Sequence, residues 1–334
     1  MREEIKVVVF GVGGVGKELV KDLTKRKGLK LVGAVDIAPE LVGKDAGVVA
    51  GCGETGVIIN ESLEAVCKEQ KPDVVFGSGA TPSNVNIARL TYEQMRPAVE
   101  NGANVIVANS NTTNLWVVEP DLAKEIDENC KKHGVSYFGI GSSQVNERLV
   151  LALTEGSANI ESITYTHHAD VHAFPPESNK VTLGIGMTKA EYDEKLSGKE
   201  KLIEECSTRM DYMGKHLGWE VDDYQFEEGV ELDEHGLIYR TIATVRGFEK
   251  GKMRIEENRI FILDPERRYY DRILIEGVPK VDSMNEFTPD RGMCTTFATM
   301  KNALPQVMKA EPGYINSLSL PACTLVDDDY RNHI

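Results

Sequence analysis

Residues 7–16 read Val-Val-Val-Phe-Gly-Val-Gly-Gly-Val-Gly, and this stretch decides the fold. Four apolar residues predict a buried parallel strand that runs directly into Gly11-x-Gly13-x-x-Gly16, and a helical pattern begins near Val15. In this arrangement Gly11 permits the tight turn, Gly13 lets a pyrophosphate approach the backbone, and Gly16 lets the helix pack closely on the strand. Free N–H groups at the start of the helix attract the anion. The stretch therefore predicts a dinucleotide-binding turn.

Asp36 follows the second predicted strand, residues 31–35, and lies 20 residues beyond Gly16. A carboxylate at this position meets the ribose hydroxyls of a dinucleotide. No arginine follows in residues 37–39, so an adenosine 2′-phosphate would face the carboxylate without a compensating cation. We therefore predict NAD as the cofactor, with NADP as an alternative if Lys44 or a more distant cation folds in. The competing interpretation is a tight turn followed by an ordinary N-cap aspartate.

Strand and helix patterns alternate six times between residue 1 and about residue 155. Such alternation demands right-handed crossovers and predicts a doubly wound Rossmann sheet, an α/β fold. Small or polar residues follow several of these strands, at the edge of the sheet where ligands bind. The predicted cofactor-binding residues are Gly11, Gly13, Gly14, Val15, Gly16, Asp36, Gly77, Ser78, Gly79, Ala80, Thr81, Ala108 and Ser142.

The pattern changes near Asn159, where a long alternating strand begins. Three further strands are predicted to be antiparallel, at residues 238–248, 253–263 and 272–277. Their sheet would suit a substrate wall and a dimer interface, so we expect a homodimer. The chain is predicted to divide into a dinucleotide-binding domain (1–157), an inserted α+β domain with a mostly antiparallel sheet (158–290), and a C-terminal helix and tail that return to the first domain (291–334).

The composition is that of an ordinary globular enzyme, with 334 residues of which 41% are hydrophobic and 27% charged. The formal net charge of -15 argues against a nucleic-acid or anionic membrane partner. No apolar run approaches the ~20 residues that cross a bilayer. The first strand starts almost at the N-terminus, and the six scattered cysteines form no Cys-x-x-Cys pair. These features predict a cytoplasmic protein with reduced thiols and no structural zinc.

His168, Asp170 and His172 alternate along one face of the long strand and are the first candidates for catalysis. Histidine exchanges protons near pH 7, and Asp170 could orient or charge a neighbouring imidazole. The competing interpretation is a solvated strand face. A metal site is not predicted, because ligands from a single strand converge poorly on one ion. Asn109 and Ser110 open a run of six polar residues and are predicted to orient a substrate carbonyl.

Several stretches resemble the 2,4-diaminopentanoate dehydrogenase and native amine dehydrogenase group, within the proteins that share the dihydrodipicolinate reductase N-terminal fold. These are 32–36 (VGAVD), 42–45 (VGKD), 119–125 (EPDLAKE), 133–135 (HGV), 139–141 (GIG), 216–219 (HLGW), 275–279 (IEGVP), 302–305 (NALP) and 310–313 (AEPG). The resemblance implies NAD(P)-linked oxidation of an amine, or reductive amination of a ketone. In that group an acidic residue follows the fifth strand; here Asn109 or Ser110 takes its place.

Two classes of function fit these observations. The first is a dehydrogenase or reductase that transfers a hydride between nicotinamide and a small polar amine, imine or carbonyl substrate. A carbonyl reductase or alcohol dehydrogenase on the same fold belongs to this class. The second is a sensor or partner protein that binds the dinucleotide without catalysis. Dependence of NADH oxidation on ammonium separates amine chemistry from alcohol chemistry.

Overall fold

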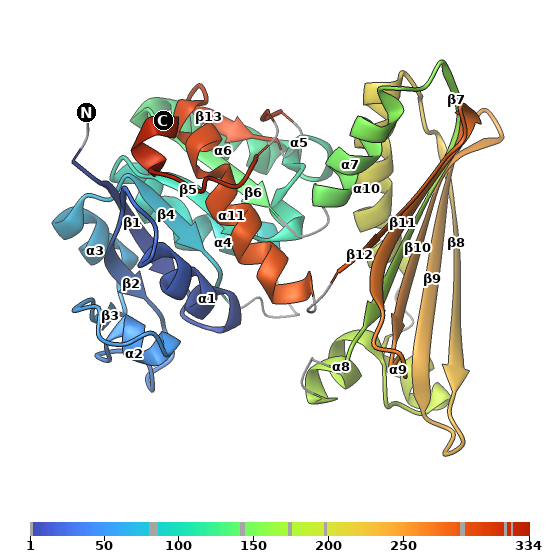
Figure 1. Cartoon of the computed structure of the whole chain (residues 1–334), viewed down its shortest axis with the longest axis horizontal. Coiled ribbons are helices and arrows are strands. Elements are labelled where there is room, and N and C mark those ends of the chain that lie inside the picture. Colours follow the sequence, from blue (N-terminus) through green and yellow to red (C-terminus); the bar gives the residue numbers. More distant parts are fainter. Residues whose placement is uncertain are drawn as a thin grey trace. The chain divides into compact units, whose positions relative to one another are not determined.

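The computed structural model describes residues 3–79, 86–140, 144–172, 176–196, 199–287, 291–316, 319–321 and 323–334 (Figure 1). The chain forms two compact units. Unit 1 contains Met1–Val145 and Gly292–Ile334, and unit 2 contains Asn146–Arg291. Within the described ranges, no helix is both long enough and apolar enough to cross a membrane.

A parallel sheet of seven strands forms the centre of unit 1. Its order is β13-β6-β5-β4-β1-β2-β3, and every neighbouring pair is parallel. The predicted Rossmann sheet is therefore confirmed. The strands are β1 (Ile5–Phe10), β2 (Leu29–Val35), β3 (Ile59–Asn60), β4 (Val74–Gly77), β5 (Asn104–Ala108), β6 (Ser136–Ile140) and β13 (Gly313–Ile315).

Helices cover both faces of this sheet because successive strand residues point to opposite sides. Val7 and Val9 of β1 pack with α1 and α11, whereas Val8 and Phe10 pack with α3, α4 and α6. The helix from Arg291 continues through Pro305, where the sequence predicted a kink or a split. The helices of unit 1 are α1 (Gly14–Leu23), α2 (Ala46–Ala50), α3 (Leu63–Gln70), α4 (Ile87–Glu100), α5 (Leu115–Val118), α6 (Pro120–His133) and α11 (Arg291–Lys309), with 3-10 turns η1 (Ser110–Thr112) and η2 (Tyr330–His333).

The C-terminal part of the chain completes unit 1. Lys301 of α11 is buried and its Nζ lies 2.8 Å from the Asp22 carboxylate of α1. Tyr330 is fully buried, and its N–H donates to the Lys27 carbonyl at 3.1 Å. Strand β13 adds to the sheet beside β6. Residues separated by the whole of unit 2 therefore share one core.

Unit 2 is built on a mixed sheet of six strands in the order β12-β11-β7-β10-β9-β8. Its β7–β10 pair is parallel and the other pairs are antiparallel. The sequence missed β8 and β12, which are the two edge strands and carry many charged residues. The strands are β7 (Asn159–Asp170), β8 (Asp223–Leu232), β9 (Ile238–Glu249), β10 (Lys252–Ile262), β11 (Tyr269–Val278) and β12 (Val281–Glu286).

The helices of unit 2 pack on one face of its sheet, the face that carries Ile163 and Tyr165 (Figure 1). Val150 of α7 belongs to the same apolar cluster as Ile163, so α7 belongs to unit 2 from Asn146 onward. The boundary between the units therefore lies at residue 146, whereas the sequence analysis placed it at residue 158. The helices are α7 (Gln144–Thr154), α8 (Pro176–Leu183), α9 (Lys189–Lys195) and α10 (Lys199–Leu217).

Candidate functional site

The glycine turn after β1 has a distinct structural reason for each glycine. Gly11 has φ +84°, a left-handed conformation that favours glycine. A Cβ on Gly16 would lie 1.8 Å from the Gly11 carbonyl oxygen, so only glycine lets α1 start this close to the turn. A Cβ on Gly13 would meet nothing within 4 Å. The backbone at Gly13 therefore borders open space at the start of α1, as the approach of a pyrophosphate requires.

The N-terminus of α1 lacks the side-chain cap that α2, α3 and α4 of unit 1 have, although α5 and α6 also lack one. Its N-cap is Gly13, with no side-chain cap hydrogen bond and no acidic residue in the first turn. In contrast, α2, α3 and α4 are capped by Asp45, Ser62 and Asn86. The first N–H groups of α1, which include those of Gly14 and Val15, are thus left for an anion. These residues fit the diphosphate of a dinucleotide.

Asp36 lies at the end of β2 and is tied to the glycine turn. Its Oδ2 accepts the Val12 N–H at 2.6 Å, and its Oδ1 accepts the Ala38 N–H at 2.9 Å. These bonds fix the carboxylate beside the turn, where the ribose would lie. The next residue, Ile37, is 73% exposed. Its side chain is apolar, so it offers no positive charge where an arginine could bind a 2′-phosphate.

The loop after β4 contacts the same turn. The Ser78 N–H donates to the Phe10 carbonyl at 2.7 Å, and Ser78 Oγ donates to the Gly11 carbonyl at 2.8 Å. Gly77 is buried in β4, and a Cβ there would lie 2.8 Å from Val107 Cγ1. Gly77 thus has a packing role, and Gly79 continues the loop beside Phe10. Ala108 ends β5, whereas the predicted cofactor contacts Ala80, Thr81 and Ser142 lie outside the described residues.

Asn109 is buried and holds the loop after β5. Its Nδ2 donates to Thr91 Oγ1 of α4 at 2.7 Å, and its Oδ1 accepts the Asn111 N–H at 3.0 Å. Both ends of the amide are therefore engaged within the fold. The predicted role of Asn109 in orienting a substrate carbonyl stays a prediction, and its contact with Thr91 could not be foreseen from the sequence. Ser110 begins the 3-10 turn η1.

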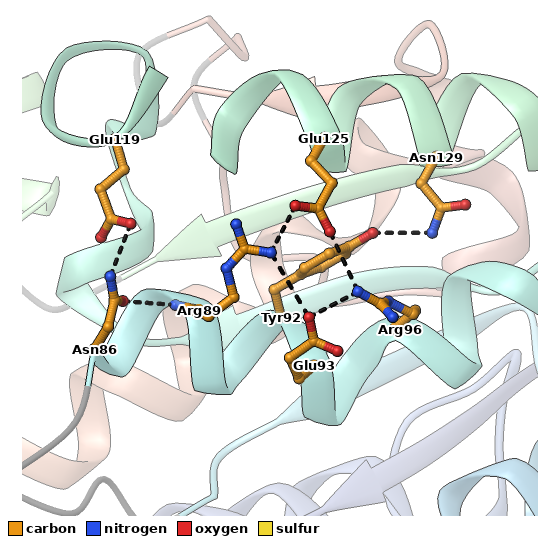
Figure 2. A network of polar contacts seen from close by, with 8 residues as sticks. All are labelled: Asn86, Arg89, Tyr92, Glu93, Arg96, Glu119, Glu125 and Asn129. Carbon is orange, nitrogen blue, oxygen red and sulfur yellow. Dashed lines mark hydrogen bonds and ion pairs between the residues drawn. The ribbon is translucent and has the colours of Figure 1, made fainter. Parts of the chain in front are cut away.

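Helix α4, which provides Thr91, is joined to α6 by a network of charged side chains (Figure 2). Glu125 of α6 accepts from Arg89 at 2.6 Å and from Arg96 at 3.2 Å. Asn129 donates to the Tyr92 hydroxyl at 3.0 Å. A groove of about 470 Å³ runs along this contact. Because the arginine and glutamate side chains of this network are paired with one another, we assign the network to the packing of α4 against α6.

In unit 2, the predicted cluster on β7 forms two histidine–aspartate pairs, which are linked because the Asp264 N–H donates to Asp170 Oδ1 at 3.0 Å. Asp170 Oδ1 bonds His172 Nδ1, whereas His168 Nε2 bonds Asp264 at 2.9 Å and its ring stacks on Tyr270. Burial opposes the ionisation of Asp264, but the Glu266 N–H, the His168 imidazole and a neighbouring guanidinium outweigh it and lower its pKa. His168 is 5% exposed, and its bond to Asp264 ties β7 to the turn between β10 and β11.

His167 forms another such pair on the helix-covered face. Its Nδ1 lies 2.7 Å from Asp271 Oδ1, which also accepts the Tyr165 hydroxyl at 2.7 Å. Asp271 is fully buried, and the His167 side chain is 19% exposed. The imidazole stands edge-on to Phe261 and Tyr269. The sequence analysis missed this pair because Asp271 lies 104 residues away, although the alternation placed His167 beside Tyr165.

Beside this pair, α10 is joined to the sheet by a buried ion network. Arg209 bonds Glu257 of β10, and Glu257 also accepts from Arg259 at 2.8 Å. Burial opposes the ionisation of Glu257, but the two guanidinium groups outweigh it and lower its pKa. Across the described ranges, no group of three or more His, Cys, Asp or Glu side chains is arranged to hold a metal ion.

Comparisons with known proteins fit this architecture. Residues 5–137 match the family described as "Dihydrodipicolinate reductase, N-terminus". The chain is 25% identical to a 2,4-diaminopentanoate dehydrogenase from Acetoanaerobium sticklandii, over 99% of this chain and 98% of that protein. The chain is an NAD(P)-dependent oxidoreductase. The predicted resemblance is therefore confirmed.

Two further proteins are similar to this oxidoreductase, one in structure and one in sequence. An amine dehydrogenase structure from Mycobacterium smegmatis superposes with a TM-score of 0.83 at 23% identity, over 98% of this chain and 99% of that one, which shows a shared fold. A 4-hydroxy-tetrahydrodipicolinate reductase from Gloeothece citriformis is 29% identical over 51% of this chain and 60% of its own length.

Proposed function

We propose that this oxidoreductase transfers a hydride between NAD and a small polar amine, or the imine derived from it. The resemblance to a 2,4-diaminopentanoate dehydrogenase over 99% of the chain supports the amine substrate class. When bound, the nicotinamide accepts or donates the hydride, and the protein supplies binding, orientation and proton exchange.

The proposed cofactor site consists of the glycine turn, Asp36 and the Ser78 loop. The uncapped start of α1 would hold the diphosphate and the Asp36 carboxylate would hold the ribose. We favour NAD over NADP because a 2′-phosphate next to Asp36 would meet a fixed anion. The neighbouring Ile37 provides no balancing charge.

Proton exchange at the reacting nitrogen needs an acid–base group. Asn109 has no suitable group, and its amide is engaged by Thr91 and Asn111. We propose that a histidine–aspartate pair of unit 2 serves instead, either His172 with Asp170 or His167 with Asp271. A carboxylate at Nδ1 orients an imidazole, so the proton would be exchanged at Nε2. In His167 this Nε2 lies 3.5 Å from the Tyr269 hydroxyl.

The function is tested by following NADH oxidation with short ketones, with and without ammonium. A rate that requires ammonium supports amine chemistry, whereas an equal rate without ammonium indicates a carbonyl reductase. Absence of turnover and of NADH binding would overturn the proposal.

Substitution of the candidate acid–base residues tests the second part of the proposal. His167→Ala or His172→Ala is expected to lower kcat by about 10²-fold or more, with partial rescue by added imidazole. His216→Ala, on α10 with its Nδ1 at the Tyr212 carbonyl, serves as the control and should change nothing. Full activity in both single variants would remove the histidines from the mechanism.

We also propose that the protein is a homodimer and acts in the cytoplasm. One sheet face of unit 2 carries the helices, and the opposite face presents Met284, which is 63% exposed, beside the Arg272–Asp282 ion pair. A second copy of the chain is our proposed cover for this face. Sedimentation of wild type and Met284→Lys at equal concentration tests this, since the substitution should shift the protein toward monomer. Free Cys67 and Cys130 suit a reducing compartment.

A further inference from the structure

The loop after β5 is held by a side chain from the far end of the chain. The Tyr314 hydroxyl of β13 donates to the Thr112 carbonyl at 2.7 Å and accepts the Leu115 N–H at 2.9 Å. Thr112 and Leu115 are fully buried. A buried backbone group that loses its partner costs about 1–3 kcal/mol, so these two bonds strongly favour a single loop conformation.

Three further contacts fix the same loop. Asn316 Nδ2 donates to Asn114 Oδ1, and Thr112 Oγ1 donates to the Asn109 carbonyl at 2.7 Å. A Cβ on Gly139 would lie 2.2 Å from the Thr112 carbonyl oxygen, so glycine in β6 allows the loop to lie directly on the sheet. The loop is therefore part of the rigid core rather than a surface connection.

This rigid loop presents one large apolar side chain to the surface. Trp116 is 43% exposed, whereas the adjacent Leu115 is fully buried. Its ring meets Tyr314 edge-to-face, with centroids 6.1 Å apart. The four-residue helix α5 is anchored by Leu115, so the fold does not need a tryptophan at position 116.

The position of Trp116 relative to the parallel sheet of unit 1 distinguishes it from an ordinary exposed apolar residue. The loop follows β5, which pairs with β4, and β4 pairs with β1. The Ser78 loop after β4 already contacts the glycine turn. Ligands of parallel sheets bind at this carboxyl edge, so Trp116 is held on the ligand-binding side of unit 1.

We propose that Trp116 contacts the hydrocarbon part of the substrate, and that Tyr314 and Asn316 are positioning residues that hold it there. This inference rests on the proposed oxidoreductase function. It assigns the substrate an alkyl portion, which stacks on the indole ring while the reacting nitrogen or carbonyl group faces the nicotinamide. Aromatic side chains bury large apolar areas and are suited to this contact.

The test uses acetone, butanone and 2-pentanone with ammonium and NADH. In the wild type, kcat/KM should rise about fourfold for each added methylene group, the gain expected from burying one CH₂. In Trp116→Ala this rise should fall to less than about twofold. Trp219→Phe alters the other tryptophan, which is buried in unit 2, and should keep the wild-type rise. A wild-type rise in Trp116→Ala would overturn the inference.

Fluorescence gives a readout that does not depend on turnover. Trp116 and Trp219 are the two tryptophans of the chain, so Trp219→Phe leaves Trp116 as the sole tryptophan emitter. Adding 2-pentanone to the complex of this variant with NAD⁺ should change the emission with a midpoint near the KM for 2-pentanone. Unchanged emission at saturating 2-pentanone would contradict the contact.

Tyr314→Phe and Asn316→Ala test the positioning role. Each should raise KM for 2-pentanone about fivefold or more and leave the Kd for NADH within twofold, because the glycine turn is not involved. If Tyr314→Phe does not fold, Asn316→Ala decides the point. Failure of the proposed function is recognised separately, because the wild type would then turn over none of the three ketones.

Discussion

Gly13→Ala separates cofactor binding from folding more sharply than any other change in the glycine turn. A Cβ at Gly13 meets nothing within 4 Å, so alanine introduces no overlap. The backbone of Gly13, at φ −83° and ψ −148°, lies just outside the extended region, and alanine there costs about 1 kcal/mol of backbone strain. The variant should therefore fold, with a urea midpoint only slightly below that of the wild type.

The same methyl group would occupy the space that the diphosphate needs. Pushing the phosphate off one backbone N–H of α1 removes a hydrogen bond to a charged group, worth about 1.5–3 kcal/mol. That loss corresponds to an increase of about 10- to 150-fold in the Kd for NADH. The Kd can be measured by NADH fluorescence titration or by calorimetry.

Gly16→Ala is the matched comparison, with the same chemical change three residues away. Its Cβ would lie 1.8 Å from the Gly11 carbonyl oxygen, so the backbone must shift and both stability and NADH affinity should fall. If folded Gly13→Ala binds NADH within threefold of the wild-type affinity, the diphosphate does not lie where we place it.

Three further predictions concern single side chains. Lys301→Met should lower the free energy of unfolding at pH 7 by about 1.5–3 kcal/mol, because it removes the buried ammonium partner of the half-buried Asp22 and leaves Arg26 alone to pair with that carboxylate. Burial opposes the ionisation of Asp22, but Arg26 and Lys301 outweigh it and lower its pKa. The difference in the free energy of unfolding between wild type and variant should therefore shrink as the pH falls below about 4, as measured by urea titration. A difference that does not change with pH would refute this assignment. Asp36→Asn should narrow the ratio of the Kd values for NADPH and NADH by about tenfold in titrations with both cofactors, whereas an unchanged ratio would exclude Asp36 from cofactor selection. Burial raises the pKa of the Cys67 thiol to about 11, so iodoacetamide at pH 8 should label exposed Cys52 within minutes and leave native Cys67 unlabelled, as measured by mass spectrometry.

The fold of unit 1 could be predicted from the sequence because its signals are local. A buried strand, a glycine turn and a helix follow one another within residues 7–23, and the strand–helix alternation that follows predicts the same fold. The edge strands β8 and β12 escaped prediction because their solvated positions carry charged residues. Edge strands are often charged to prevent aggregation, and this weakens the apolar alternation that identifies a strand.

The candidate site was harder to predict because its contacts join distant residues. Alternation along β7 correctly placed His168 and His167 on opposite faces, but it could not supply their partners Asp264 and Asp271. The engagement of Asn109 by Thr91 likewise depends on how α4 packs beside β5. Residue type and spacing suggested chemistry at these positions, whereas the partners follow only from the three-dimensional pairing.

The arrangement of β13 beside β6 has a consequence for synthesis on the ribosome. All of unit 2 is translated after β6 and before β13, so the growing chain carries β6 as an open sheet edge for much of its production. Unit 2 is one continuous segment of the chain, so it can fold before unit 1 is complete. Unit 1 gains β13 and the buried Tyr330 only after all of unit 2 has been made, and until then the open edge of β6 is a strand edge for chaperones to protect.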